Sequence, residues 1–388
     1  MSQPNWIAGP QSLLGAPPYR LAGNTHNHIL RAWLGAASII AACGVVIFGL
    51  RVLEVLAGAV GGALLTNAVV ALVTGKKITD QALRATLTGV LLALTLPALT
   101  SWPIALFGAV VSILIGQCLF QGWLQPALVG RIVTQAAFPG FLSVGGSMLL
   151  SPVLTPGHMI FGDIEDTERI VDYRGWLESQ ESTTHDAYLI QKPVRTLRQF
   201  AQNQVKPNAD LRYTPLLRDL LPPWSDTVFG VVPGGIGETC TVMLVIVGLY
   251  LIHRGYLRWQ LPLTVIASAA LTVSILPVEV ANDYRWFPAL EVEQGRAVGL
   301  AYVLFHLTTG QIMLTAFLLA GDVVASPMRA HGQIIYAAFI GALSIFMRLY
   351  GVLEGECYWS VLIMNLFVGT INRQLRRPVL GMEPPSDD

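Results

Sequence analysis

Apolar runs of membrane-spanning length recur along this 388-residue chain and limit its fold more than any other feature. A helix needs roughly 20 mostly apolar residues to cross a bilayer. Only 12% of the residues are charged, about half the share found in soluble domains. We therefore expect an all-α polytopic membrane protein with about ten transmembrane helices. The ten runs are 33–50, 52–73, 85–101, 103–123, 126–150, 238–253, 259–277, 297–320, 333–350 and 357–372.

Basic residues gather in alternate short loops, which predicts an orientation under the positive-inside rule. Lys76 and Lys77 follow the second run, Arg258 precedes the seventh, and Arg373 follows the tenth. The loops on the opposite side are acidic or mixed. All these basic positions fall on one side if both termini are cytoplasmic.

The runs divide the chain into five parts. We expect a cytoplasmic N-terminal arm (1–32), a first five-helix repeat (33–153), a large extracytoplasmic loop (154–233), a second five-helix repeat (234–372) and a cytoplasmic tail (373–388). Loops longer than about 15 residues are usually functional or disordered. The long loop is therefore a candidate location for a site.

The two membrane parts share a sequence pattern. Leu87-Thr88-Gly89 opens an apolar run that leads to Pro103, and Thr308-Thr309-Gly310 opens another that leads to Pro327. Five runs separate the two copies, so they cross the membrane in opposite directions. This pattern is typical of inverted repeats with binding sites at interrupted helices. The alternative is that membrane helices simply share Gly, Ala and Leu.

Charged or polar residues inside apolar runs are costly in lipid and often functional. His306, Asp322, Arg131 and Arg348 are such residues. Asp322 either contributes to a cofactor or ion site or caps the short helix that follows it. His306 is a candidate site residue or an interhelical hydrogen-bond partner. The two arginines have the alternative of extending to the membrane surface.

A glycine-rich turn, Gly234-Gly235-Ile236-Gly237-Glu238-Thr239, ends the long polar segment and precedes an apolar run. Bare amides at the start of a helix can approach a ligand closely and favour an anionic group. The alternative is a flexible entry turn capped by Thr239.

Other classes of function lack support in the sequence. The net charge is zero, so no basic surface for nucleic acid is implied. The four cysteines are scattered without a metal-binding spacing. No G-x-G-x-x-G segment follows a strand, so NADH chemistry would belong to other subunits.

Several stretches together resemble the membrane flavoprotein subunit of Rnf and Nqr electron-transport complexes (RnfD, NqrB). They occur in the family's order and cover most of the chain outside 140–205. The segments are LTGVLLALTLP ending at Pro97, TPLL at Thr214–Leu217, PGGIGET ending at Thr239, RWQLPL at Arg258–Leu263, GDVVASP ending at Pro327 and MNLF ending at Phe367.

The resemblance implies FMN esterified through its phosphate to a threonine on the outer side, and riboflavin in the helical part. Thr214, which precedes Pro-Leu, is the implied acceptor. Leu211, Arg212 and Tyr213 replace the Ser-x-Ala that precedes the acceptor in the family. The hydroxyl-rich patch 182–184 is a second, less favoured candidate.

The expected flavin sites follow from these residues. Tyr213 or Trp224 would stack on the FMN ring. The glycine turn would line this flavin through Gly234, Gly235, Glu238 and Thr239. Riboflavin would lie between broken helices near His306, Thr309 and Asp322.

The resemblance implies a subunit of an Rnf-type ion-translocating ferredoxin:NAD oxidoreductase complex in the bacterial inner membrane. It would pass electrons between flavins and partner iron–sulfur and flavin subunits, coupled to Na+ or H+ movement, while embedded in lipid. Two alternatives remain: a secondary transporter built from inverted repeats, and a family-like scaffold subunit that lacks covalent FMN.

Overall fold

The computed structural model describes residues 26–375 with gaps. The gaps are 76–77, 99, 140–141, 143–192, 203–212, 218–220, 222–223, 231, 233, 281–282, 294, 323–324 and 352–353. The terminal arm (1–25), the tail after 375 and the 182–184 patch therefore lie outside the described residues.

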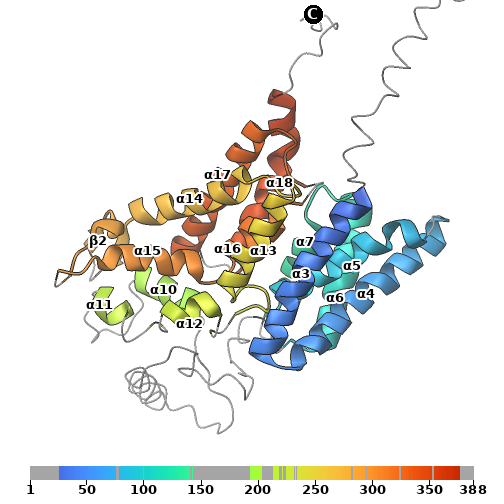
Figure 1. Ribbon diagram of the computed structural model, residues 1–388, viewed down its shortest axis with the longest axis horizontal. Helices are drawn as coiled ribbons and strands as arrows, with labels where there is room; N and C mark the ends of the chain where they lie inside the picture. Colours follow the sequence, from blue (N-terminus) through green and yellow to red (C-terminus); the bar gives the residue numbers. More distant parts are fainter. Residues whose placement is uncertain are drawn as a thin grey trace, which may run out of the picture.

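Five apolar segments form the first group of helices, drawn in blue to cyan in Figure 1. They are α3 (His26–Phe48), α4 (Arg51–Thr74), α5 (Ile78–Thr95), α6 (Trp102–Val111), which continues as the π-helix η2 (Ser112–Leu119), and α7 (Pro126–Ala137). Gly75 ends α4 in a left-handed conformation, with φ of 67°, and its amide donates to the carbonyl of Ala71. Such a C-terminal glycine is a common helix stop.

The second group of helices is drawn in yellow to red in Figure 1. Its members are α13 (Thr241–His253), α14 (Gln260–Ile275), α15 (Val298–Thr308), α16 (Ile312–Leu314) with the π-helix η5 (Thr315–Leu319), α17 (Ala330–Tyr350) and α18 (Glu356–Gln374). The axes of α15 and of the segment 312–319 differ by 57°.

Short elements lie in the connections from α7 to α13 and from α14 to α15, and those before α13 lie at the end of the bundle opposite the C-terminus of α18 (Figure 1). They are α10 (Pro193–Ala201), α11 (Tyr213–Pro215), α12 (Trp224–Phe229), the antiparallel strands β1 (Val278–Val280) and β2 (Asp283–Arg285), and the 3-10 turn η4 (Pro288–Leu290).

Small residues let the helices of each group approach closely. A Cβ on Gly58 of α4 would lie 2.6 Å from the carbonyl oxygen of Trp102, where α6 begins. A Cβ on Gly341 of α17 would lie 2.4 Å from the carbonyl oxygen of Val265 in α14. Close backbone approach at small residues is typical of packing between membrane helices. Helix α3 also contacts α13, and α7 contacts α18, so the two groups form one bundle.

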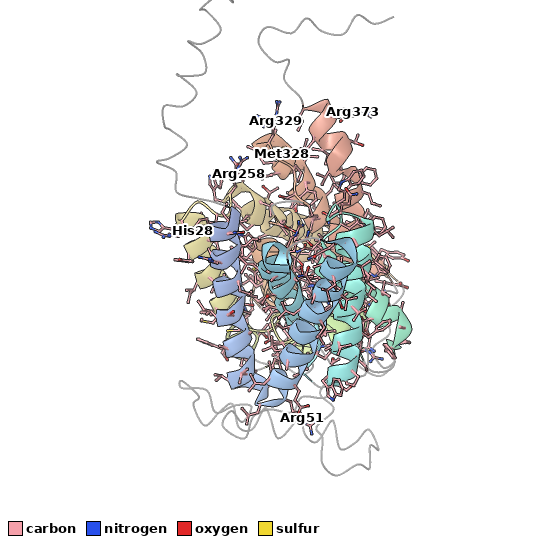
Figure 2. All side chains as sticks on the ribbon, turned by 90° about the vertical axis from the view of Figure 1, so that its right-hand side faces the viewer. His28, Arg51, Arg258, Met328, Arg329 and Arg373 are labelled. Carbon is pink, nitrogen blue, oxygen red and sulfur yellow. The ribbon has the colours of Figure 1, made fainter. Side chains whose placement is uncertain are left out.

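Each of the ten predicted runs overlaps a helix, and the chain is a mostly helical membrane protein. Within the described residues, four helices are long and apolar enough to span a bilayer, or five if the bent pair 298–308 and 312–319 counts as one span. The first helix begins at His26 rather than at 33. Figure 2 shows Arg258, Arg329 and Arg373 at one end of the bundle and Arg51 at the other.

Two glycines on α3 allow a matched test of how the groups meet. A Cβ on Gly44 would lie 2.6 Å from Cγ2 of Ile236, whereas Gly35 has open space around it. We expect Gly44→Ala to destabilise the protein by about 1–3 kcal/mol through overpacking. Gly35→Ala should be neutral or stabilising by up to about 1 kcal/mol, since alanine favours helix. Thermal unfolding in detergent measures both; equal midpoints would contradict this contact.

Candidate functional site

The glycine turn binds the chain's own backbone. The amide of Ile236 donates to the carbonyl of Leu96 at 2.9 Å, and the amide of Gly237 donates to Leu94 at 2.8 Å. Both carbonyls lie at the end of α5, where a helix leaves acceptors unpaired. A Cβ on Gly237 would lie 2.8 Å from the Cβ of Leu94, so glycine permits the approach. These amides close the end of α5, and they do not face a ligand as the sequence suggested.

Glu238 extends this junction to α7 and α18. One carboxylate oxygen accepts the amide of Gly235 at 3.0 Å, and the other accepts the hydroxyl of Tyr358. The guanidinium of Arg131 lies 5.7 Å from the centre of the Tyr358 ring. Its Nε donates to the carbonyl of Thr95 at 3.0 Å. Arg131 is thus buried in the junction and does not extend to the membrane surface.

Gly234 and Thr239 pack against each other within the turn. A Cβ on Gly234 would lie 2.8 Å from Cγ2 of Thr239. The buried hydroxyl of Thr239 has no hydrogen-bond partner among the described residues. Cys240, not Thr239, occupies the N-cap position of α13, and no side chain caps this helix. The capping role predicted for Thr239 is therefore wrong.

The break between α15 and α16 is closed by Arg348 of α17. Its Nη1 donates to the carbonyl of His306 at 2.7 Å and approaches that of Thr309 at 3.4 Å. Gly310 supplies the bend with a φ of 76°. A cation beside the C-terminal carbonyls of a helix also complements the helix dipole.

Glu356 holds the Arg348 guanidinium in place. Arg348 Nε donates to Oε1 of Glu356 at 2.8 Å, and Arg198 Nη2 lies 3.5 Å from Oε2. The Arg348 side chain is fully buried, so the alternative that it reaches the membrane surface is also wrong.

The His306 ring sits in an aromatic environment. Its centre lies 4.6 Å from that of Tyr302, in an edge-to-face arrangement. Neither ring nitrogen has a hydrogen-bond partner among the described residues. The predicted interhelical hydrogen bond of this side chain is therefore not found in that part of the chain.

Thr214 lies in the short turn α11 and is held by Glu293. The Glu293 carboxylate accepts the amide of Tyr213 at 3.0 Å, the amide of Thr214 at 2.8 Å and the Thr214 hydroxyl at 2.5 Å. A phosphate bonded to Thr214 Oγ1 would meet this carboxylate. The residues around Thr214 therefore do not fit the phosphate group of an esterified FMN.

Tyr213 packs inward from the same turn. Its ring centre lies 5.3 Å from those of both Phe200 and Tyr302, and its side chain is fully buried. Burial, aided by the charge of Glu291, raises the pKa of Tyr213 above its ordinary value. Because its ring is enclosed, Tyr213 cannot stack on a flavin as the sequence suggested. Trp224 is half exposed on α12.

A cleft opens on the other side of the bundle, between α3, α5, α7 and the end of η5. Its open space of about 450 Å³ includes the solvent at its mouth. The indole N–H of Trp33 and one Arg84 nitrogen are buried without a partner among the described residues. The cleft is lined by Leu30, Trp33, Arg84, Leu87, Thr88, Leu91, Gln125, Pro126, Ala127, Leu318 and Asp322.

The structure separates the residues expected to surround riboflavin. His306 and Thr309 lie at the bend beside Arg348, whereas Asp322 lines the cleft with Trp33. Sequence reasoning missed Trp33 and Arg84. An arginine near the start of an apolar run was the available signal, but nothing in the sequence paired it with α3.

The apolar helices, their closed breaks and their buried charges define a multi-pass membrane protein that is mostly helical. The family described as NQR2, RnfD, RnfE matches residues 14–381, and the chain belongs to this family.

Its relatives include members of ion-translocating complexes. The chain is 28% identical over 340 residues to the D subunit of the Na(+)-translocating ferredoxin:NAD(+) oxidoreductase complex of Acetobacterium woodii, covering 87% of this chain and 85% of the relative. It is 28% identical to the D subunit of the proton-translocating ferredoxin:NAD(+) oxidoreductase complex of Clostridium ljungdahlii, covering 85% and 84%. It is 30% identical to the D subunit of the ion-translocating oxidoreductase complex of Stutzerimonas stutzeri, covering 76% and 75%.

The Arg348–Glu356 pair gives a direct test of the closed bend. We expect Arg348→Met to cost about 3–5 kcal/mol, because it leaves a buried carboxylate poorly compensated. Adding Glu356→Leu should recover part of this loss. The matched control is Arg285→Met, which breaks a partly exposed pair with Glu291 and should cost about 1 kcal/mol or less. Unfolding by SDS in mixed micelles measures all three; equal losses for Arg348→Met and Arg285→Met would refute the assignment.

Proposed function

We propose that this chain is the membrane flavoprotein subunit of an Rnf-type ion-translocating ferredoxin:NAD oxidoreductase complex in a bacterial inner membrane. The observation that carries the proposal is its similarity to the Acetobacterium woodii relative over 87% of this chain and 85% of that relative. The names of the relatives specify Na+ in one case and protons in another. The coupled ion here is accordingly Na+ or H+.

The proposed architecture is ten crossings in two inverted five-helix halves, with both termini cytoplasmic. It is supported by a similar pattern of contacts in the two groups. Helix α4 contacts α5 and α6, and helix α14 contacts α15 and α17. The orientation is supported by Arg258, Arg329 and Arg373, which gather at one end (Figure 2). The segment before α13, including α10–α12, then belongs to the extracytoplasmic side.

Riboflavin is the flavin proposed for the cleft, which would have to widen to admit the ring. Apolar walls with a few convergent polar groups are typical of small-molecule sites. Trp33 supplies a buried N–H donor without a partner among the described residues, Arg84 supplies a guanidinium, and Asp322 supplies an acceptor for hydroxyl groups. When bound, riboflavin supplies electron transfer. The chain itself contributes binding, orientation and exclusion of lipid.

Partner subunits complete the proposed activity. Iron–sulfur and flavin subunits of the complex would deliver and remove electrons, since this sequence contains no nicotinamide-binding fingerprint. The helix bend at Gly310 also favours the secondary transporter as a second candidate, because broken helices mark many transporter sites. The presence or absence of bound flavin separates the two.

Extraction of riboflavin from the purified complex tests this function. We expect Trp33→Ala to weaken riboflavin retention by up to about tenfold, because a hydrogen bond from the indole N–H contributes about 0.5–1.5 kcal/mol. The matched control is Trp123→Ala, since Trp123 is 76% exposed and lies outside the cleft lining.

His306→Ala provides a second control. It should leave the flavin in place, because His306 lies at the bend and not in the cleft lining. Chromatography of acid extracts gives the riboflavin content of each variant. A wild-type complex without riboflavin would contradict the proposal and favour the transporter.

A further inference from the structure

The Glu293 carboxylate occupies the place that a phosphate on Thr214 would need. Two backbone amides and one hydroxyl converge on its two oxygens, at 3.0, 2.8 and 2.5 Å. Amides that converge in this way form an anion-binding concavity. Here the anion is a side chain contributed by the segment between η4 and α15, 79 residues further along the chain.

Esterification of Thr214 would turn its attractive hydrogen bond with Glu293 into a repulsive contact between two negative groups. In the transfer of FMN from FAD, the threonine oxygen attacks the flavin-bearing phosphorus, the pyrophosphate bond breaks and AMP leaves. The hydroxyl loses its proton to a base, so Oγ1 ceases to be a donor. The new phosphodiester carries one negative charge and would lie against the carboxylate that the hydroxyl formerly bound. Two like charges in contact disfavour each other strongly in a partly buried site.

The residues beside the Thr214–Glu293 contact are themselves held in place. Tyr213 is fully buried between two aromatic rings, so the residue before the acceptor is fixed in the interior. Arg285 is engaged with Glu291 at 3.8 Å. Burial raises the pKa of Tyr213 first, and the carboxylates of Glu291 and Glu293 raise it further while Arg285 lowers it.

We propose that Glu293 is an internal substitute for the phosphate and keeps Thr214 unmodified in the wild-type chain. Glu293 is then a specificity-determining residue that excludes Thr214 from flavin transfer. This inference rests on the proposed function, since it concerns a subunit that carries riboflavin but no esterified FMN.

In-gel flavin fluorescence of the denatured chain tests this proposal. The full chain is co-expressed with its partner subunits and an active flavin transferase, and a second protein carrying the transferase's preferred sequence confirms that the transferase works. We expect a dark band for the wild type. Glu293→Ala should give a fluorescent band and the mass increase of one esterified FMN. The double variant Glu293→Ala/Thr214→Ala should be dark again.

Two further variants are useful. One separates the effect of the Glu293 charge from that of its side chain filling the turn, and the other is a control in the same segment of the chain. Glu293→Gln keeps an acceptor in the turn but removes the charge, so it should give a band weaker than that of Glu293→Ala. Glu291→Ala removes a neighbouring carboxylate whose described ion pair is with Arg285, and it should stay dark.

A fluorescent wild-type chain would overturn the proposal. So would a dark Glu293→Ala chain that assembles with its partners, because the block would then lie elsewhere. Non-covalent riboflavin in the acid extract reports separately on the proposed function. A dark chain with riboflavin supports both proposals, a fluorescent chain overturns only this one, and a chain without any flavin overturns the proposed function.

Discussion

Backbone groups exposed by a helix break inside lipid must be bonded by the protein, because the hydrocarbon core holds no water to replace them. The described residues include two such breaks, at the ends of α5 and α15, and a distant segment closes each one. The amides of Ile236 and Gly237 take the carbonyls at the end of α5, and Arg348 takes those at the end of α15. The rest of the bundle depends on these closures. They place α13 against the first group of helices and α17 against the bend.

Much of the fold was predictable, because lipid imposes a length and an apolar composition that the sequence displays directly. Each predicted run overlaps a helix, and the Thr308-Thr309-Gly310 segment lies where a helix breaks. The partners across the bundle were not predictable. Glu238 with Tyr358, and Thr214 with Glu293, are far apart in sequence, and no periodicity links them. Glycines in a sequence indicate close approach, but they do not identify what approaches.

The candidate site was predictable only in part for the same reason. Asp322 was singled out as a polar residue in an apolar run, and the structure places it in the cleft beside Trp33. Its supposed companions His306 and Thr309 lie at the bend instead. Sequence proximity grouped the three residues, whereas the helix segment 312–319 separates them. At Thr214 the acceptor motif survives, but the identity of its neighbour Glu293 changes what the hydroxyl can do.

The Arg348 contacts also bear on motion. The carbonyls of α15, the guanidinium of α17 and the carboxylate of α18 come from three helices, and all are buried. Pulling them apart would strand opposite charges in a medium of low polarity. The bend is therefore a fixed point of the bundle, and any opening there would have to break contacts among three helices at once.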